Sequence, residues 1–129
     1  MGYTRYWKRT EEPLSKDFLA DVNRVIKDAA RYGIAIRGGD GTGLPEIELD
    51  RVCFNGNANA DKDLSHETFI LDDDTGFNFC KTARKPYDYV VRTVLRIALD
   101  YGIVEDVSDD GVNEQIYSDE MYLRDMIVW

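Results

Sequence analysis

The chain has 129 residues, 43% of them apolar, and a formal net charge of −9, which suits one folded domain with a substantial core. Such an acidic surface repels duplex nucleic acid and anionic membrane, so an anionic ligand has to be small enough for a local basic pocket. No stretch approaches the roughly 20 apolar residues that span a bilayer, and the N-terminus lacks the apolar run of a signal peptide. We therefore expect a cytoplasmic single domain over residues 1–129.

The first half of the chain predicts a strand, a helix and further strands. Alternating aromatic and polar residues predict a strand at 3–9. Apolar residues at helical spacing predict a helix over 16–32, which Ser15 caps and Gly33 ends. The segments that follow are a strand at 34–37, a glycine-rich connection at 38–45, one or two strands in 46–56 and a polar loop at 57–65.

The second half predicts a hairpin and a second helix. Strands at 66–72 and 77–83 flank a turn at 73–76 and are expected to pair. Pro86 suits the first position of a helix that Gly102 ends. A strand with a turn at 103–111 and a short helix at 118–129 complete the chain.

This order, β-α-β-β-β-β-α-β with a final helix, predicts the fold class. Consecutive strands favour an antiparallel or mixed β-sheet, and the two amphipathic helices are expected to pack on one face of it. We therefore expect an α+β fold.

A group of basic residues lies just before the second predicted helix, in the stretch "FCKTARKPYD". Lys81, Arg84 and Lys85 stand out in an acidic chain, and the first turn of a helix adds unpaired N–H groups and partial positive charge. Together these features predict an anion site, most naturally for phosphate, to which Thr82 adds a hydroxyl. The alternative is a solvated basic turn that pairs with surface acids.

Aromatic residues supply a second candidate group, which consists of Tyr3, Tyr6, Trp7 and Tyr87. If the first strand lies beside the basic block, some of these rings can stack on a base, and Tyr3, Trp7 or Tyr87 is expected to cover it. Asn55 and His66 would add polar contacts to the same ligand. Core packing is the alternative for the rings, including Tyr6.

His66 is the one histidine of the chain and is followed by Glu67, which gives an enzymatic alternative. A histidine titrates near neutral pH and can act as a general base. Adjacent residues in a strand face opposite sides, however, so these two side chains do not converge on one atom. With two cysteines, Cys53 and Cys80, and no CxxC pair, we expect two buried thiols, with a disulfide between them as the alternative. We expect no metal site and no cofactor.

Several motifs together resemble one family. The opening Gly2-Tyr3-Thr4 with Tyr6 and Trp7, the short pieces 54–56 and 66–69, and the block 79–88 are similar to a family of small uncharacterised proteins of bacterial and phage genomes. Its members carry a GYTxYW signature and an FCKTARKPYD block. The family has no established activity, so the resemblance implies a phage or prophage setting and no chemistry.

The leading hypothesis is a non-enzymatic binding protein for a small phosphorylated ligand, most plausibly a nucleotide. In a phage it would sequester a nucleotide immune signal of the host. One alternative is a nucleotide-processing enzyme, a phosphodiesterase or transferase, that uses His66 and Glu67. Another is an acidic inhibitor that binds a host nucleic-acid-binding protein. The apolar end at 127–129 favours a homo-oligomer, or else it docks on the core.

Overall fold

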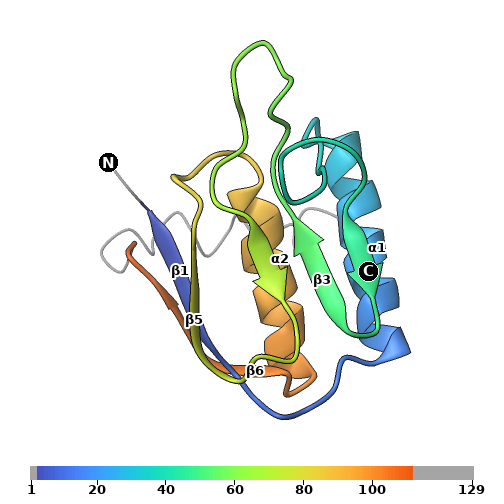
Figure 1. The fold of residues 1–129 in the computed structure, drawn as a ribbon, viewed down its shortest axis with the longest axis vertical. Helices are drawn as coiled ribbons and strands as arrows, with labels where there is room; N and C mark the ends of the chain where they lie inside the picture. Colours follow the sequence, from blue (N-terminus) through green and yellow to red (C-terminus); the bar gives the residue numbers. More distant parts are fainter. Residues whose placement is uncertain (1–2, 112–129) are drawn as a thin grey trace.

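In the computed structural model, which describes residues 3–111, the chain forms two helices and six strands (Figure 1). The elements run as a strand and a helix followed by four strands, a helix and a strand; this string matches the predicted one, but the segment 46–56 supplies two strands and the predicted strand at 34–37 is absent. The elements are β1 (Thr4–Arg9), α1 (Lys16–Arg31), β2 (Glu46–Glu48), β3 (Arg51–Phe54), β4 (Phe69–Leu71), β5 (Gly76–Lys81), α2 (Asp88–Asp100) and β6 (Val104–Asp109).

The strands form two antiparallel sheets of three strands each, in the orders β5-β1-β6 and β2-β3-β4. The α+β prediction is confirmed, with two sheets where one was expected. The predicted hairpin is wrong, because β4 pairs with β3 while β5 pairs with β1. A physical reason is the number of residue pairs that each partner strand allows. Strand β5 forms six residue pairs with β1, whereas β4 has only three residues to pair with it.

Helix α1 begins at Lys16, as predicted, and ends at Arg31, one residue before the predicted end. The side chain of Ser15 accepts a hydrogen bond from the Phe18 N–H, which satisfies one of the free donors of the first turn. At the other end Gly33 has a φ of +82°, the left-handed conformation that glycine adopts without steric cost.

Helix α2 begins at Asp88, two residues later than predicted. Ala83 and Arg84 both have positive φ, and the amides of Lys85 and Asp88 bond to the carbonyls of Thr82 and Lys85 in successive turns. The chain therefore turns twice before the helix starts, and the residue after Pro86, Tyr87, becomes the N-cap. The prediction of Pro86 as the first helical residue is wrong.

Three other predicted segments differ from the structure or lie outside it. Residues 34–37 form no strand, only an isolated bridge between Arg37 and Asn55, because the next amide, at Gly38, already turns back to the carbonyl of Thr42. The predicted strand at 66–72 is limited to β4. The predicted helix at 118–129 lies outside the described residues.

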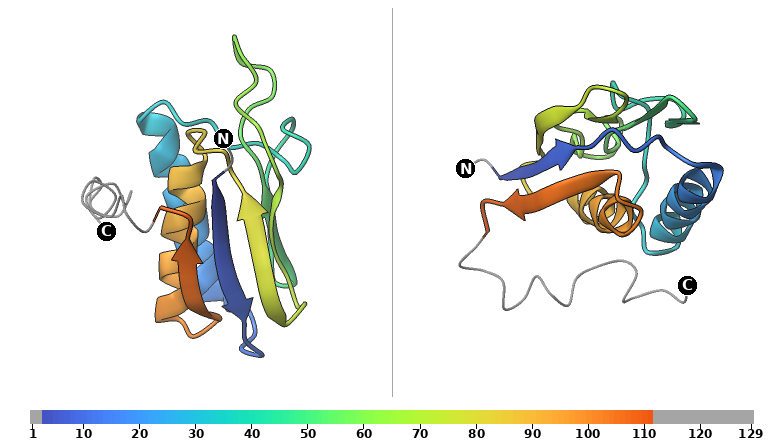
Figure 2. Two further views of the ribbon diagram at one scale, coloured as in Figure 1. Left: turned by 90° about the vertical axis from the view of Figure 1, so that its left-hand side faces the viewer. Right: turned by 90° about the horizontal axis from the view of Figure 1, so that it is seen from below.

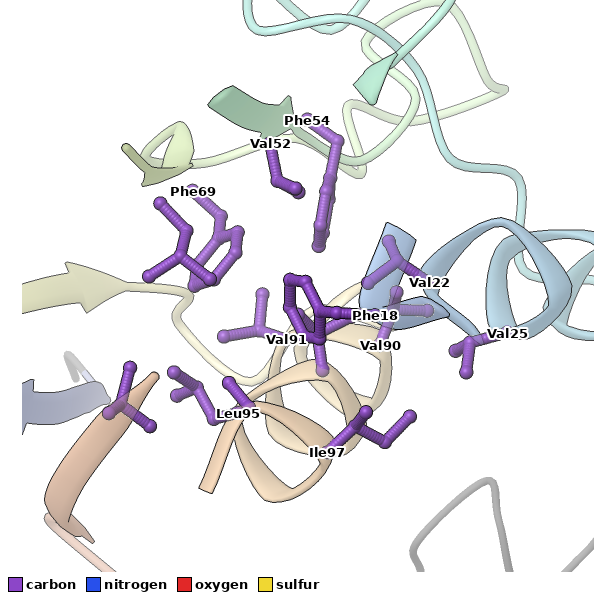
Figure 3. Close-up of a cluster of buried hydrophobic side chains, with 14 of the residues drawn as sticks. Phe18, Val22, Val25, Val52, Phe54, Phe69, Val90, Val91, Leu95 and Ile97 are labelled. Atoms are coloured by element: carbon purple, nitrogen blue, oxygen red, sulfur yellow. The ribbon is translucent and has the colours of Figure 1, made fainter. Parts of the chain in front are cut away.

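The core lies where both helices meet the β2-β3-β4 sheet (Figure 3). Phe54 and Phe69 pack together with ring centroids 5.0 Å apart and face apolar side chains of both helices. Helix α2 packs against α1 and against β6, so it lies between the first helix and the sheet that contains β1 (Figure 2). In residues 3–111 neither helix has the length and apolar character needed to cross a membrane.

The N-cap of α1 can be tested by mutation. Ser15→Ala removes the acceptor for the Phe18 amide, so we expect the free energy of unfolding to fall by about 1 kcal/mol. Urea denaturation followed by circular dichroism measures this change. Thr75→Ala, in an exposed turn, is the control and is expected to change stability by less than about 0.5 kcal/mol. Equal stabilities of the two variants would contradict the capping role.

Candidate functional site

The backbone of residues 63–67 is the point at which several predicted site residues meet. The Asn55 amide donates to the carbonyls of Gly39 and His66, and its oxygen accepts from the amides of Gly56 and His66 at 2.7 and 3.0 Å. Asn55 is buried, and these four bonds use its whole side-chain capacity. Its observed role is to hold the chain at His66.

Two residues of the 79–88 block hold the same segment from the other side. The Lys85 ammonium donates to the carbonyls of Asp63 and Ser65 at 2.9 and 2.6 Å. The Tyr87 hydroxyl donates to the carbonyl of Glu67 at 2.6 Å. Burial strongly raises the pKa of Tyr87, so the hydroxyl keeps its proton and remains a donor. The structure thus brings Asn55, Lys85 and Tyr87 together around one loop.

The start of α2 already has an internal anion. Asp88, its first residue, accepts two bonds from Arg5, from Nε at 2.9 Å and Nη2 at 2.7 Å, and a third from the Thr82 hydroxyl at 2.6 Å. Arg5 also donates to Asp109 of β6 at 2.9 Å. Because Asp88 stands where the helix dipole favours negative charge, its carboxylate occupies the position predicted for a bound anion.

The three cations of the basic block have three separate partners. The guanidinium of Arg84 lies over the ring of Tyr3, 4.0 Å from its centroid. The ammonium of Lys81 lies 5.9 Å from the centroid of the Phe79 ring, while Lys85 is held by the carbonyls of 63–65. Positive φ at two successive residues turns the chain between these side chains, so the structure does not gather them on one point.

The three aromatic rings predicted to cover a base are all buried. Tyr3, Trp7 and Tyr87 are 5%, 2% and 1% exposed. Tyr3 and Trp7 do share a face of β1 with Arg5, as the two-residue period required, but that face is the inner one. Burial is also the main reason why the pKa of Tyr3 rises to about 12.

His66 and Glu67 lie on the surface just before β4. The Glu67 carboxylate accepts the Lys81 amide at 2.8 Å, which joins the two sheets at this end. The side chains follow a loop held by Asn55, Lys85 and Tyr87, so the backbone beneath them is well supported.

Sequence reasoning missed a line of rings on the outer face of β1 and β5. Phe77 and Phe79 are 70% and 47% exposed, and the half-buried Tyr6 is stacked on Phe77. Ring centroids are 6.1 Å apart for both Tyr6–Phe77 and Phe77–Phe79, with interplanar angles of 27° and 43°. The alternation of Phe77, Asn78 and Phe79 could have indicated this line of rings, because residues two apart in a strand lie on the same face.

Two surface hollows flank this line of rings. One, of about 330 Å³, lies between β4 and β5 and is lined by Glu67, Thr68, Ile70, Phe77, Asn78 and Phe79. The other, of about 350 Å³, lies over β1 and β6 and is lined by Tyr6, Trp7, Lys8, Phe77, Asp106 and Ser108. Both volumes reach the lower end of the range for small-molecule sites. Phe77 borders both hollows.

Both cysteines are free and buried. Burial raises the pKa of Cys80 to about 12, so its thiol is protonated and unreactive near neutral pH. Among residues 3–111, no three His, Cys, Asp or Glu side chains cluster closely enough to hold a metal ion.

Comparison of the chain with protein-family models, with curated proteins and with solved structures gives no match. The family resemblance drawn from the motifs therefore stays a prediction.

The buried ion pair at the start of α2 predicts a large loss of stability on mutation. Asp88→Asn leaves the Arg5 guanidinium buried without its main counter-charge, which costs about 3 to 5 kcal/mol. Glu105→Gln is the matched control, because Lys8 and Glu105 form an exposed pair whose loss costs less than about 1 kcal/mol. Urea unfolding of both variants measures the difference. Similar losses of unfolding free energy in the two variants would show that the buried pair is not essential for stability.

Alkaline pH is expected to weaken the fold. Tyr3 and Tyr87 have raised pKa values in the folded protein, mainly through burial, so their neutral forms are favoured there. Their contribution is complete below the ordinary tyrosine value of 10.0 and is lost as pH rises toward the folded values, about 12 for Tyr3. Urea midpoints should therefore fall between about pH 10 and 12. The urea midpoint of a Tyr3→Phe variant should fall less over this pH range than that of the wild type. Equal falls in the two proteins would count against this account.

Proposed function

We propose that this protein is a non-enzymatic binding protein for a small phosphorylated ligand, a nucleotide, whose base stacks on Tyr6, Phe77 and Phe79. The observation that carries the proposal is the exposed line of rings between two hollows. Phenylalanine is among the residues most often buried, and large exposed apolar surfaces mark binding sites. These rings replace Tyr3, Trp7 and Tyr87 as the stacking surface.

Lys81 is the cation that we assign to the phosphate. It is exposed and its ammonium lies beside the Phe79 ring, so a base on that ring brings its phosphate within reach of the ammonium. The net charge of −9 disfavours a long polyanion and limits the ligand to a few phosphates. Aromatic stacking contributes about 1 to 3 kcal/mol per base, which gives the rings the larger share of affinity.

The proposed binding without turnover would also have a biological role. In the phage or prophage setting that the motif resemblance implies, a nucleotide binder would act by sequestering a signal nucleotide of the host. Cyclic di- and trinucleotides and ADP-ribose derivatives are therefore the first ligands to test.

Isothermal titration calorimetry with these nucleotides and with AMP tests the proposal. We expect binding to the wild type and about a 5- to 150-fold loss in Phe79→Ala, the equivalent of one stacked base. Leu49→Ala, which truncates an exposed apolar residue elsewhere, is the control and should retain wild-type affinity. Absence of heat with every nucleotide would remove the proposal.

The phosphate contact has its own prediction. Lys81→Gln keeps the side-chain length and removes the charge, so affinity should fall by about tenfold and become less dependent on salt. Lys62→Gln, at an exposed position in the loop before His66, removes the same charge as a control. Equal effects of the two substitutions would show that only net charge matters.

A further inference from the structure

Phe77 divides the outer face of the β5-β1-β6 sheet into two compartments. Its side chain is 70% exposed and borders both the hollow beside β4 and the hollow over β6. In the register of the strands Phe77 is opposite Lys8, and Phe79 is opposite Tyr6. The Phe77 ring is therefore flanked by Tyr6 on the neighbouring strand and by Phe79 on its own.

A ligand with a single base can use only one of these compartments. Tyr6 and Phe79 already contact the Phe77 ring at centroid distances of 6.1 Å, but its side chain is 70% exposed and borders both hollows, so a base in either hollow can contact it. Apolar side chains, Phe among them, act as wedges between successive bases in protein–nucleic acid complexes. The position of Phe77 fits such a wedge.

The polar groups in the two hollows are mixed. One hollow contains Glu67, Thr68 and Asn78, and the other contains Asp106, Ser108 and Lys8. Carboxylates accept hydrogen bonds, hydroxyls donate and accept them, and the Lys8 ammonium donates, so these linings do not select between bases.

Two lysines on the same face are available to bind the phosphates of the ligand. Lys81 lies beside Phe79, and Lys8 is opposite Phe77, where it forms an exposed pair with Glu105 at 3.4 Å. An exposed pair of this kind contributes at most about 1 kcal/mol, so Lys8 can exchange Glu105 for a phosphate at little cost.

From these observations we propose that the ligand is a dinucleotide, held with one base in each of the two hollows that Phe77 borders. The inference rests on the proposed nucleotide-binding function and names the class of ligand. The hollow between β4 and β5 takes one base, the hollow over β1 and β6 takes the other, and the linking phosphate passes over the exposed edge of Phe77.

Calorimetry with AMP and with the linear dinucleotide pApA tests this inference. The wild type is expected to bind pApA at least about tenfold more tightly than AMP, because the second base adds its own stacking. Phe77→Ala should abolish that preference, and Leu49→Ala should keep it. Because Phe77 is so exposed, thermal unfolding of the variant should match that of the wild type and confirm that it folds.

Each other outcome has a defined meaning. Equal affinities for AMP and pApA would overturn the dinucleotide inference and leave the proposed function standing, whereas no binding of either would overturn both. A preference for pApA that persists in Phe77→Ala would show that Phe77 is not the wedge. A wild-type dimer that becomes a monomer in Phe77→Ala, measured by light scattering, would assign the rings to self-association and overturn the inference.

Discussion

The buried guanidinium of Arg5 is the interaction on which the arrangement of this fold depends. From the middle strand β1 it bonds to Asp88 at the start of α2 and to Asp109 at the end of β6. A buried charge is costly unless it is paired, so the three elements have to meet at this point. Thr82 completes the pairing by donating to Asp88 from the chain that follows β5.

This pairing also accounts for the position of the basic block. The residues from 82 to 87 turn twice with two positive φ values, an arrangement that costs about 1 to 3 kcal/mol per non-glycine residue. The hydrogen bonds of Thr82, Lys85 and Tyr87 offset this cost by holding both ends of the turn. Lys85 and Thr82 are thereby engaged within the protein, and Lys81 remains on the outer face beside Phe79.

The two faces of β1 have different roles, one in the stability of the fold and the other in the proposed binding. Its inner face carries Arg5, which bonds to Asp88 of α2, and Trp7, which belongs to the core; Tyr3, one residue before the strand, is also buried. Its outer face carries Tyr6 and Lys8, which join the rings of β5. A substitution on one face is therefore expected to change stability, and a substitution on the other to change binding, with little overlap between the two effects.

The sequence by itself determined the α+β class and the first helix with its Ser15 cap, because these depend on local periodicity and on residues within one turn. It also determined that Tyr3 and Trp7 share a face, since side chains alternate along a strand. Only the tertiary structure decided which face is buried, because both faces of 3–9 carry aromatic residues. Long-range pairing of β1 with β5 and β6 turns Trp7 inward and leaves Tyr6 and Phe77 outside, and no local pattern reports such a pairing.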